Sequence, residues 1–178
     1  MSKIVVLLGS MRKGGNTDLL VQAFVNGAIQ NNEIEVVSVA DYRVKPCIGC
    51  NACFTSDENK CFQTDDMNRI YRGLRNADVL VIASPVYFYG ISAELKAMID
   101  RLHTPARNKF KIKKLALLLV GAASLPNMFA AIEMQYQLIL DFFHLEDIGR
   151  IFVQGVKDKG DIQGHPALKQ AYILGASM

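Results

Sequence analysis

A chain of 178 residues has room for one domain with a single buried core, so we expect residues 1–178 to form one domain. Hydrophobic residues make up 51% of the chain and charged residues 21%, a composition that excludes an intrinsically disordered protein. The formal net charge of +3 at pH 7 lacks the concentrated positive charge of nucleic-acid-binding proteins, so we expect no nucleic-acid partner.

The first apolar run, Ile4–Leu8, is too short for the core of a signal peptide or for a membrane span. We therefore expect a cytoplasmic protein with no membrane partner. Along the rest of the chain, apolar runs alternate with amphipathic stretches, which is typical of βαβ units and a parallel sheet. The predicted strands are residues 4–8, 34–39, 79–83, 115–120 and 148–153.

The predicted helices begin at Asn16 and then cover residues 67–74, 95–102, 128–143 and 166–174. Asn16 or Thr17 is expected to cap the first of them. Five strands with crossover helices predict a doubly wound α/β sheet, whose ligand site lies at the carboxyl ends of the strands where the strand order reverses. The loops after the first, third and fourth strands are therefore the candidate site.

The loop after the first strand joins glycines to hydrogen-bond donors in the order Gly9-Ser10-Met11-Arg12-Lys13-Gly14-Gly15-Asn16-Thr17. Its small residues let the backbone curl so that N–H groups at the helix start face an anion. Ser10 and Thr17 add hydroxyl donors. Asn16 adds an amide and Arg12 a planar cation suited to phosphate. These residues predict a phosphate site, the alternative being an ordinary glycine-rich turn.

Two well-known phosphate motifs do not match this loop. A nucleoside-triphosphate P-loop needs Lys and then Ser or Thr after its second glycine, but Gly14 is followed by Gly15-Asn16. The dinucleotide pattern G-x-G-x-x-G fails as well, because Gly9 is followed by Ser10-Met11.

The pattern G-S-x-R-x-x-G-N-T resembles the phosphate loop of the NADPH-dependent FMN reductase family, a branch of the flavodoxin-like superfamily. The resemblance implies that Ser10, Arg12, Asn16 and Thr17 bind the FMN phosphate. It also implies a flavodoxin-like sheet of five parallel strands in the order 2-1-3-4-5, with helices on both faces.

The loop after the third strand, predicted at Ser84–Gly90, carries three consecutive aromatic residues, which cannot all be buried. Exposed aromatic side chains at the edge where the strands end can bind a ligand with a flat, partly polar ring. The block S-P-x-Y, followed by L-K-x-x-[IL]-D-R, is similar to the family's segment beside the flavin. The resemblance implies that the flavin ring contacts Pro85, Val86, Tyr87 and Phe88. A hydrophobic contact between subunits is the alternative.

Other residues in these blocks have weaker assignments. Lys96, Asp100 and Arg101 also match the family block, but we expect them to form structural ion pairs. Gly121 and Ala122 follow the fourth strand, where small residues permit a ligand to approach closely.

All four cysteines lie in one segment, as Cys47, Cys50, Cys53 and Cys61. Thiolates spaced three residues apart can wrap one face of an iron–sulfur cube, with a fourth arriving from further along the chain. Tetrahedral zinc uses the same ligands, and free or redox-active thiols are a further alternative. The spacing resembles the compact motif of the iron–sulfur flavoproteins, which carry a [4Fe–4S] cluster beside FMN. Plain flavin reductases of the family share a similar segment, so the alternatives stay open.

The resemblance implies an FMN-dependent oxidoreductase that takes hydride from NAD(P)H and passes electrons to a flavin, a quinone or a similar small acceptor. Because FMN carries the chemistry, we expect no catalytic side-chain base. The alternative is an iron–sulfur electron carrier between a ferredoxin-type partner and FMN, and a flavin-bound regulator is a third. The resemblance also implies a homodimer or homotetramer.

Overall fold

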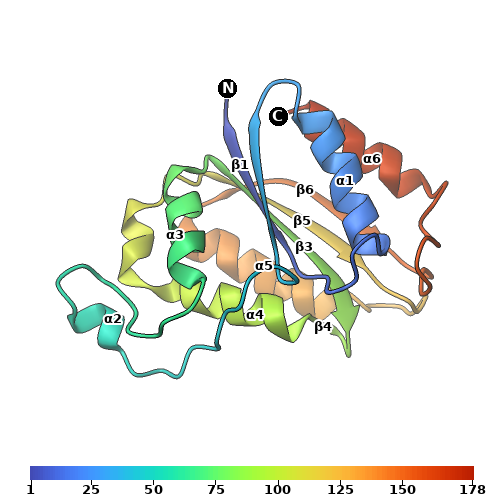
Figure 1. The fold of residues 1–178 in the computed structure, drawn as a ribbon. Coiled ribbons are helices and arrows are strands. Elements are labelled where there is room, and N and C mark those ends of the chain that lie inside the picture. The colour runs from blue at the N-terminus through green and yellow to red at the C-terminus, as the bar shows by residue number, and fades with distance from the viewer.

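The computed structural model describes residues 1–178 and contains a mostly parallel sheet (Figure 1). Its five parallel strands are β1 (Lys3–Leu8), β2 (Glu33–Ser38), β3 (Val79–Tyr87), β5 (Lys114–Val120) and β6 (Glu146–Val153). They are arranged in the order β2-β1-β3-β5-β6. This is the predicted flavodoxin-like order 2-1-3-4-5 when only the parallel strands are counted. The prediction missed β4 (Gly90–Ile91), which pairs antiparallel with the end of β3.

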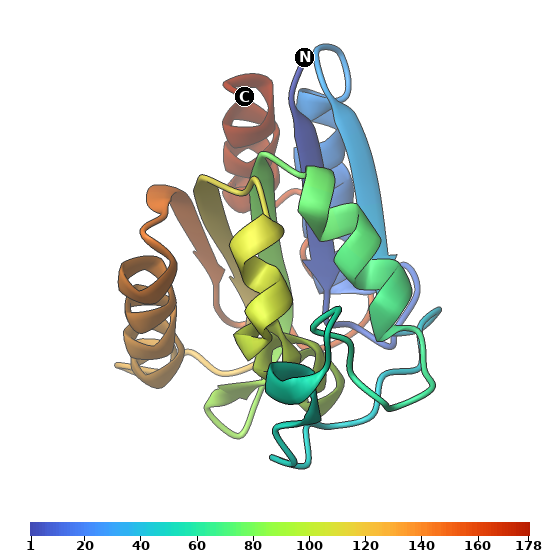
Figure 2. The same ribbon diagram turned by 90° about the vertical axis from the view of Figure 1, so that its left-hand side faces the viewer.

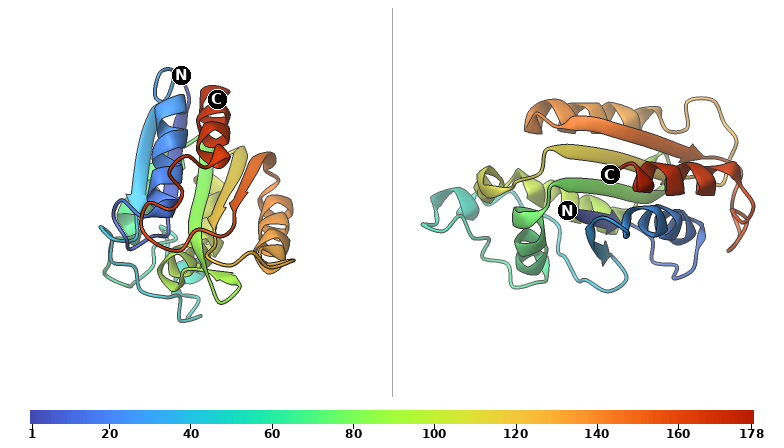
Figure 3. Two further views of the ribbon diagram at one scale, coloured as in Figure 1. Left: turned by 90° about the vertical axis from the view of Figure 1, so that its right-hand side faces the viewer. Right: turned by 90° about the horizontal axis from the view of Figure 1, so that it is seen from above.

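The central strands are continuous apolar runs because both faces of the sheet are covered. The helices are α1 (Asn16–Ala28), α2 (Ala52–Thr55), α3 (Met67–Asn76), α4 (Ala93–Asp100), α5 (Ala130–Phe143) and α6 (Pro166–Ala176). Helices α1 and α6 cover one face, and α3, α4 and α5 cover the other, as Figures 2 and 3 show. Helices on both faces were predicted.

Alternation along β1 divides its side chains between the two halves of the core. Val5 and Leu7 pack with α3 and α4, whereas Ile4, Val6 and Leu8 pack with α1. Successive strand residues point to opposite faces, so this division follows from the backbone geometry.

The structure differs from the prediction mainly where chain segments distant in sequence meet. Helix α1 begins at Asn16 as predicted, but its N-cap is Gly15 and no side chain caps it, so the predicted cap was wrong. Strand β3 runs on to Tyr87 rather than ending at Ala83, because Gly90–Ile91 folds back and pairs with its last residues. The short helix α2 within the cysteine segment was not predicted.

None of the helices is both long enough and apolar enough to cross a membrane.

Candidate functional site

The loops after β1, β3 and β5 meet at one edge of the sheet, where the strand order reverses. The Gly9 N–H donates to the Ala83 carbonyl at 2.7 Å, joining the loop after β1 to β3. Pro85 on β3 lies in register with Val120 on β5. The cysteine segment lies at the same end of the molecule, opposite the two termini (Figure 2). The predicted phosphate, ring and cysteine residues therefore gather at one end of the fold.

Backbone N–H groups of the loop after β1 are left without acceptors. Hydrogen bonds hold the loop's shape: the Arg12 N–H donates to the Ser10 hydroxyl at 3.2 Å, and the Gly14 N–H donates to the Asp18 carboxylate at 2.5 Å. The N–H groups that donate to no protein acceptor belong to Ser10, Met11, Lys13, Asn16, Thr17 and Asp18. Unpaired donors at a helix N-terminus form a ready site for an anion.

The hydroxyls of Ser10 and Thr17, which are predicted to bind phosphate, differ in whether they already form hydrogen bonds within the protein. Thr17 is buried, and its hydroxyl makes no hydrogen bond within the protein. The Ser10 hydroxyl accepts from the Arg12 N–H and donates to the Arg12 carbonyl at 3.4 Å. Thr17 is therefore free to donate to a ligand, whereas the hydroxyl of Ser10 also shapes the loop.

The Asn16 side chain forms hydrogen bonds with a segment distant in sequence, residues 158–162. Its Nδ2 donates to the Asp158 carbonyl at 2.8 Å, and its Oδ1 accepts from the N–H groups of Gly160 and Ile162. These bonds hold the loop after β6 against the loop after β1. The Asn16 backbone N–H stays free, but its amide side chain anchors a loop rather than facing solvent.

That anchored loop brings a cation which the sequence analysis missed. The Lys159 ammonium lies 3.2 Å from the position that a Cβ on Gly14 would occupy. Gly14 has a φ of +67°, so its lack of a side chain serves both the turn and the approach of Lys159. Arg12 also contacts this loop: its Nη1 donates to the Lys157 carbonyl at 3.4 Å. No local pattern around Lys159 indicates this position.

The predicted ring-binding residues form a β-hairpin at the end of β3. Tyr87 pairs with Gly90, and the turn between them consists of Phe88 and Tyr89, with φ values of 48° and 65°. Two positive φ angles define the tight hairpin turn that normally takes Asn-Gly, so two aromatic residues here store backbone strain. Phe88 is 98% exposed. The hairpin thus presents its aromatic rings at the edge where the strands end.

Gly121 and Ala122 differ in their surroundings. The Sδ atom of Met128 lies 2.9 Å from the position of a Cβ on Gly121, so this glycine accommodates Met128. Ala122 is exposed at the same edge. A groove of about 660 Å³ borders the loop after β1 at Met11 and runs between residues 39–45 and α4. It does not include the predicted phosphate or ring residues, which lie on the open edge.

The four cysteines line a single cavity of about 150 Å³. Residues 42–51 of this segment form no helix or strand. The cavity wall is completed by residues of α3 and of the turn after α4, among them Tyr71, Arg101 and His103. Burial raises the pKa of Tyr71 to about 12, which keeps its phenol protonated while its O–H donates to the Arg101 carbonyl at 2.7 Å.

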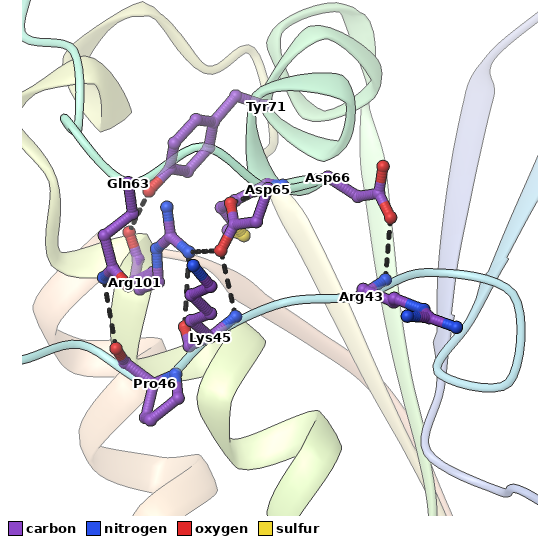
Figure 4. A network of polar contacts seen from close by, with 9 residues as sticks. Arg43, Lys45, Pro46, Gln63, Asp65, Asp66, Tyr71 and Arg101 are labelled. Atoms are coloured by element: carbon purple, nitrogen blue, oxygen red, sulfur yellow. Dashed lines mark hydrogen bonds and ion pairs between the residues drawn. The ribbon is translucent and has the colours of Figure 1, made fainter.

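A buried ion pair between Arg101 and Asp65 supports this cavity (Figure 4). The Asp65 side chain is 4% exposed and that of Arg101 is 2% exposed. Nη1 of Arg101 donates to Asp65 and to the Lys45 carbonyl. Burial disfavours the Asp65 carboxylate, but hydrogen bonds from Arg101 and from the backbone N–H groups of Lys45 and Met67 outweigh it and lower its pKa.

Ion pairing was expected for the charged residues after the hairpin, and the structure shows it. Lys96 pairs with Asp100 one turn along α4. Arg101 pairs with Asp65 rather than with its neighbour in sequence. Nε and Nη2 of Arg101 are buried and have no hydrogen-bond partner.

The cysteine cavity offers the ligand type of an iron–sulfur cluster, but its sulfur atoms do not lie close enough together to hold one. All four cysteines line one cavity, and two of them, Cys47 and Cys50, are exposed. No three His, Cys, Asp or Glu side chains converge closely enough to hold a metal ion. The irregular segment of residues 42–51 would therefore have to close around a cluster or a zinc ion.

Comparison with known proteins identifies the family. Residues 2–155 match the model of the NADPH-dependent FMN reductase family. An iron–sulfur flavoprotein of Methanosarcina thermophila is 34% identical over 168 residues, which cover 93% of this chain and 84% of the relative. An iron–sulfur flavoprotein of Methanocaldococcus jannaschii is 41% identical over 112 residues. That match covers 62% of this chain but spans only 56% of the relative's length.

Solved structures agree on the fold. An NAD(P)H:quinone oxidoreductase from Methanothermobacter marburgensis superposes with a TM-score of 0.80 at 15% identity, covering 99% of this chain and 96% of the other. At that identity the likeness establishes the flavodoxin-like fold alone. The matched family model spans β1 to β6 and includes the loop after β1, the hairpin and the cysteine segment. The chain therefore belongs to the NADPH-dependent FMN reductase family.

Proposed function

We propose that this protein binds FMN at the loop after β1 and passes electrons from NAD(P)H to a small acceptor. The observation that carries the proposal is the set of N–H groups between residues 10 and 18 that have no acceptor, beside the unpaired Thr17 hydroxyl. The FMN phosphate is an anion with several acceptor oxygens, which suits donors at a helix start. Family membership supports the same ligand.

In this proposal each residue of the loop has a separate role. The backbone N–H groups and the Thr17 hydroxyl donate to the phosphate oxygens, while Arg12 and Lys159 supply positive charge. Ser10 fixes the curve of the loop. Asn16 holds the loop after β6 in place, and thereby positions Lys159. The phosphate site then joins two segments that are about 140 residues apart in sequence.

The hairpin lies at the same edge of the sheet as this loop, which supports it as the site of the flavin ring. We assign the ring contacts to Pro85, Val86, Tyr87 and Phe88, and further contacts to Gly121 and Ala122 at the start of the loop after β5. Bound FMN supplies the chemistry, accepting hydride from NAD(P)H and giving electrons to a flavin, a quinone or a similar acceptor. The protein binds and orients the ring, and this role requires no side-chain base.

The test is the isosteric substitution Thr17→Val, which removes the hydroxyl and keeps the shape of the side chain. Because that hydroxyl has no partner within the protein, the stability of the free protein should not change. A hydrogen bond to a charged group is worth ~1.5–3 kcal/mol, so the Kd for FMN should rise about 10- to 100-fold. Quenching of FMN fluorescence by protein stripped of flavin gives the Kd.

Thr55→Val, at an exposed threonine of α2, is the matched control and should leave the FMN Kd unchanged. NADH and NADPH oxidation with a quinone or free flavin as acceptor then measures the activity. Wild-type protein that is colourless and does not quench FMN would overturn the proposal. If the Thr17→Val protein binds FMN as tightly as wild type, the Thr17 hydroxyl does not bind the phosphate.

An iron–sulfur electron carrier is the second candidate function. It is favoured by the four cysteines that line one cavity. Anaerobic purification followed by an absorption spectrum and assays of iron and sulfide separates the two candidates. Rapid NAD(P)H oxidation by protein that contains no iron would reject the carrier.

We also propose that the protein assembles as a homo-oligomer through α5. Met134, Leu138 and Phe142 are 65%, 61% and 50% exposed and recur every four residues along one face of the helix. A two-fold axis at Leu138 pairs Met134 of one copy with Phe142 of the other, so the face is complementary to itself. Leu138 and Phe142 also border an apolar cavity of about 480 Å³.

A further inference from the structure

The apolar cavity beside α5, here called the α5 cavity, lies away from the candidate flavin site. It holds about 480 Å³, and twelve of its seventeen lining residues are hydrophobic. It is lined by Leu80 near the start of β3, Lys113 just before β5 and Leu145 just before β6. Because the strands are parallel, these positions lie at the edge of the sheet opposite the loops after β1, β3 and β5. The volume is typical of small-molecule sites, which hold ~300–1,000 Å³.

The segment of residues 107–113 forms one wall of the α5 cavity, in which apolar and cationic side chains alternate. Phe110 and Ile112 are half-buried and line the cavity. Lys111, which lies between them, is exposed and does not line it. Successive side chains of an extended chain point to opposite sides, so the apolar residues face the cavity and the intervening lysine faces solvent.

Two cations, Arg107 and Lys113, line the α5 cavity at the two ends of this segment. The guanidinium carbon of Arg107 lies 5.1 Å from the centre of the Phe142 ring, and its Nη1 donates only to backbone carbonyls. Asp100 also lines the cavity, but its carboxylate is paired with Lys96. Arg107 and Lys113 therefore remain available to an anionic group of a ligand.

We propose that the α5 cavity binds a small amphipathic carboxylate, such as a fatty acid of medium chain length. The hydrocarbon chain packs between α5 and the side chains of Phe110 and Ile112, and the carboxylate lies between Arg107 and Lys113. Burial of the chain removes apolar surface from water, and hydrogen bonds from the two cations fix its orientation. This site is additional to the proposed flavin site and does not depend on it.

The experiment titrates full-length protein with decanoate, below the concentration at which decanoate forms micelles, in a calorimeter. One decanoate should bind per chain. Octanoate has two fewer CH₂ groups and should bind about 15-fold more weakly, since each buried CH₂ contributes ~0.8 kcal/mol. Decanamide has the same chain without the charge. It should bind about fivefold more weakly than decanoate, because ion pairs at a partly exposed site are weak.

Two variants test the two parts of the site. Lys113→Gln should raise the Kd for decanoate about two- to fivefold and leave that for decanamide unchanged. Lys111→Gln is the matched control, because it removes an exposed lysine of the same segment that does not line the cavity. Ile112→Phe should fill part of the cavity and weaken both ligands. If Ile112→Phe does not fold, Lys113→Gln decides: a raised Kd for decanoate alone supports the inference, and an unchanged one overturns it.

Wild-type protein that binds no decanoate would overturn the inference. If that protein also sediments as an oligomer, a second copy of the chain covers the cavity instead. Equal affinity for decanoate and decanamide would show that the cations do not select the ligand, and would reject the carboxylate. Binding to vesicles of anionic phospholipid, without binding of free decanoate, would replace the small molecule with a membrane surface. Quenching of FMN fluorescence by the same samples reports on the flavin site separately.

Discussion

Lys159 is the residue whose role depends most on the folded chain. It lies in the loop after β6, beyond the segment matched by the family model, yet its ammonium lies over Gly14. The bonds from Asn16 to Asp158, Gly160 and Ile162 are what place it there. A sequence motif at residues 9–17 can therefore be complete and still omit one of the charges at the site.

Lys159→Ala should weaken binding of FMN but not of riboflavin, because only FMN carries the phosphate. Lys159 is exposed, so the loss should be small, about 0.2–1 kcal/mol or up to about fivefold in Kd. The Kd for FMN should also become less sensitive to salt. Fluorescence titrations with both flavins measure this, with Lys169→Ala on α6 as the control. Equal weakening for riboflavin would contradict the assigned role.

The ion pair between Asp65 and Arg101 contributes to the free energy of unfolding, and this contribution depends on pH. The pKa of Asp65 is lower in the folded state than in the unfolded state, where it is about 3.9. The stabilisation by the ionised carboxylate is therefore fully present above the unfolded pKa, and it is lost as the pH falls through the folded pKa. Asp65→Asn should lower the free energy of unfolding by about 3 kcal/mol at neutral pH, since Arg101 is left buried without its counter-charge.

Between about pH 5 and pH 2 the Asp65→Asn variant should also lose stability less steeply than wild type, because it lacks the titrating carboxylate. Urea denaturation at a series of pH values measures both effects. Asp57→Asn, at an exposed carboxylate without an ion pair, controls for the loss of charge. Parallel pH slopes for wild type and Asp65→Asn would refute the assignment.

At the scale of elements, the hairpin between β3 and β4 stands out because its turn contradicts local preference. Phe88 and Tyr89 both adopt positive φ angles, which bulky residues seldom do. The pairing of Tyr87 with Gly90 and the bond from the Ser92 N–H to the Ser84 hydroxyl hold the turn closed. We attribute the retained strain to the aromatic surface that the turn exposes.

Tyr89→Gly should stabilise the protein by about 1 kcal/mol, because glycine adopts a positive φ without steric cost. Tyr89→Ala is the matched control: it removes the ring but keeps the strained backbone, and should show no gain. The urea midpoint at constant m-value gives the comparison. Equal stability of the two variants would mean that the turn is not strained.

For the whole molecule, the apolar face of α5 leads to a prediction about assembly. Leu138→Glu should convert the homo-oligomer to a smaller species, since it places a charge at the centre of a self-complementary apolar contact. Sedimentation velocity gives the mass of each species. Ile173→Glu on α6 is the control, because Ile173 is 55% exposed and lies on a helix that covers the opposite face of the sheet. A wild-type protein that sediments as a monomer would reject the prediction.

The sheet, the helices on both faces and the segments that form the candidate site were all predictable from the amino-acid sequence. Periodic apolar runs and glycine-rich turns are local properties, because the faces of a strand or helix are set by residues two to four apart. All five parallel strands and their order therefore followed from the pattern and from the resemblance. The spacing of the four cysteines likewise placed them together before the fold was known.

Which groups meet across the sheet edge became apparent only in the folded chain. The Asn16 side chain turned toward residues 158–162, Lys159 approached Gly14, and Arg101 paired with Asp65 rather than with Asp100. Each of these contacts joins residues far apart in sequence, and no period or spacing encodes such a pairing. The extension of β3 to Tyr87 has the same cause, since strand ends are fixed by the partner that accepts their hydrogen bonds.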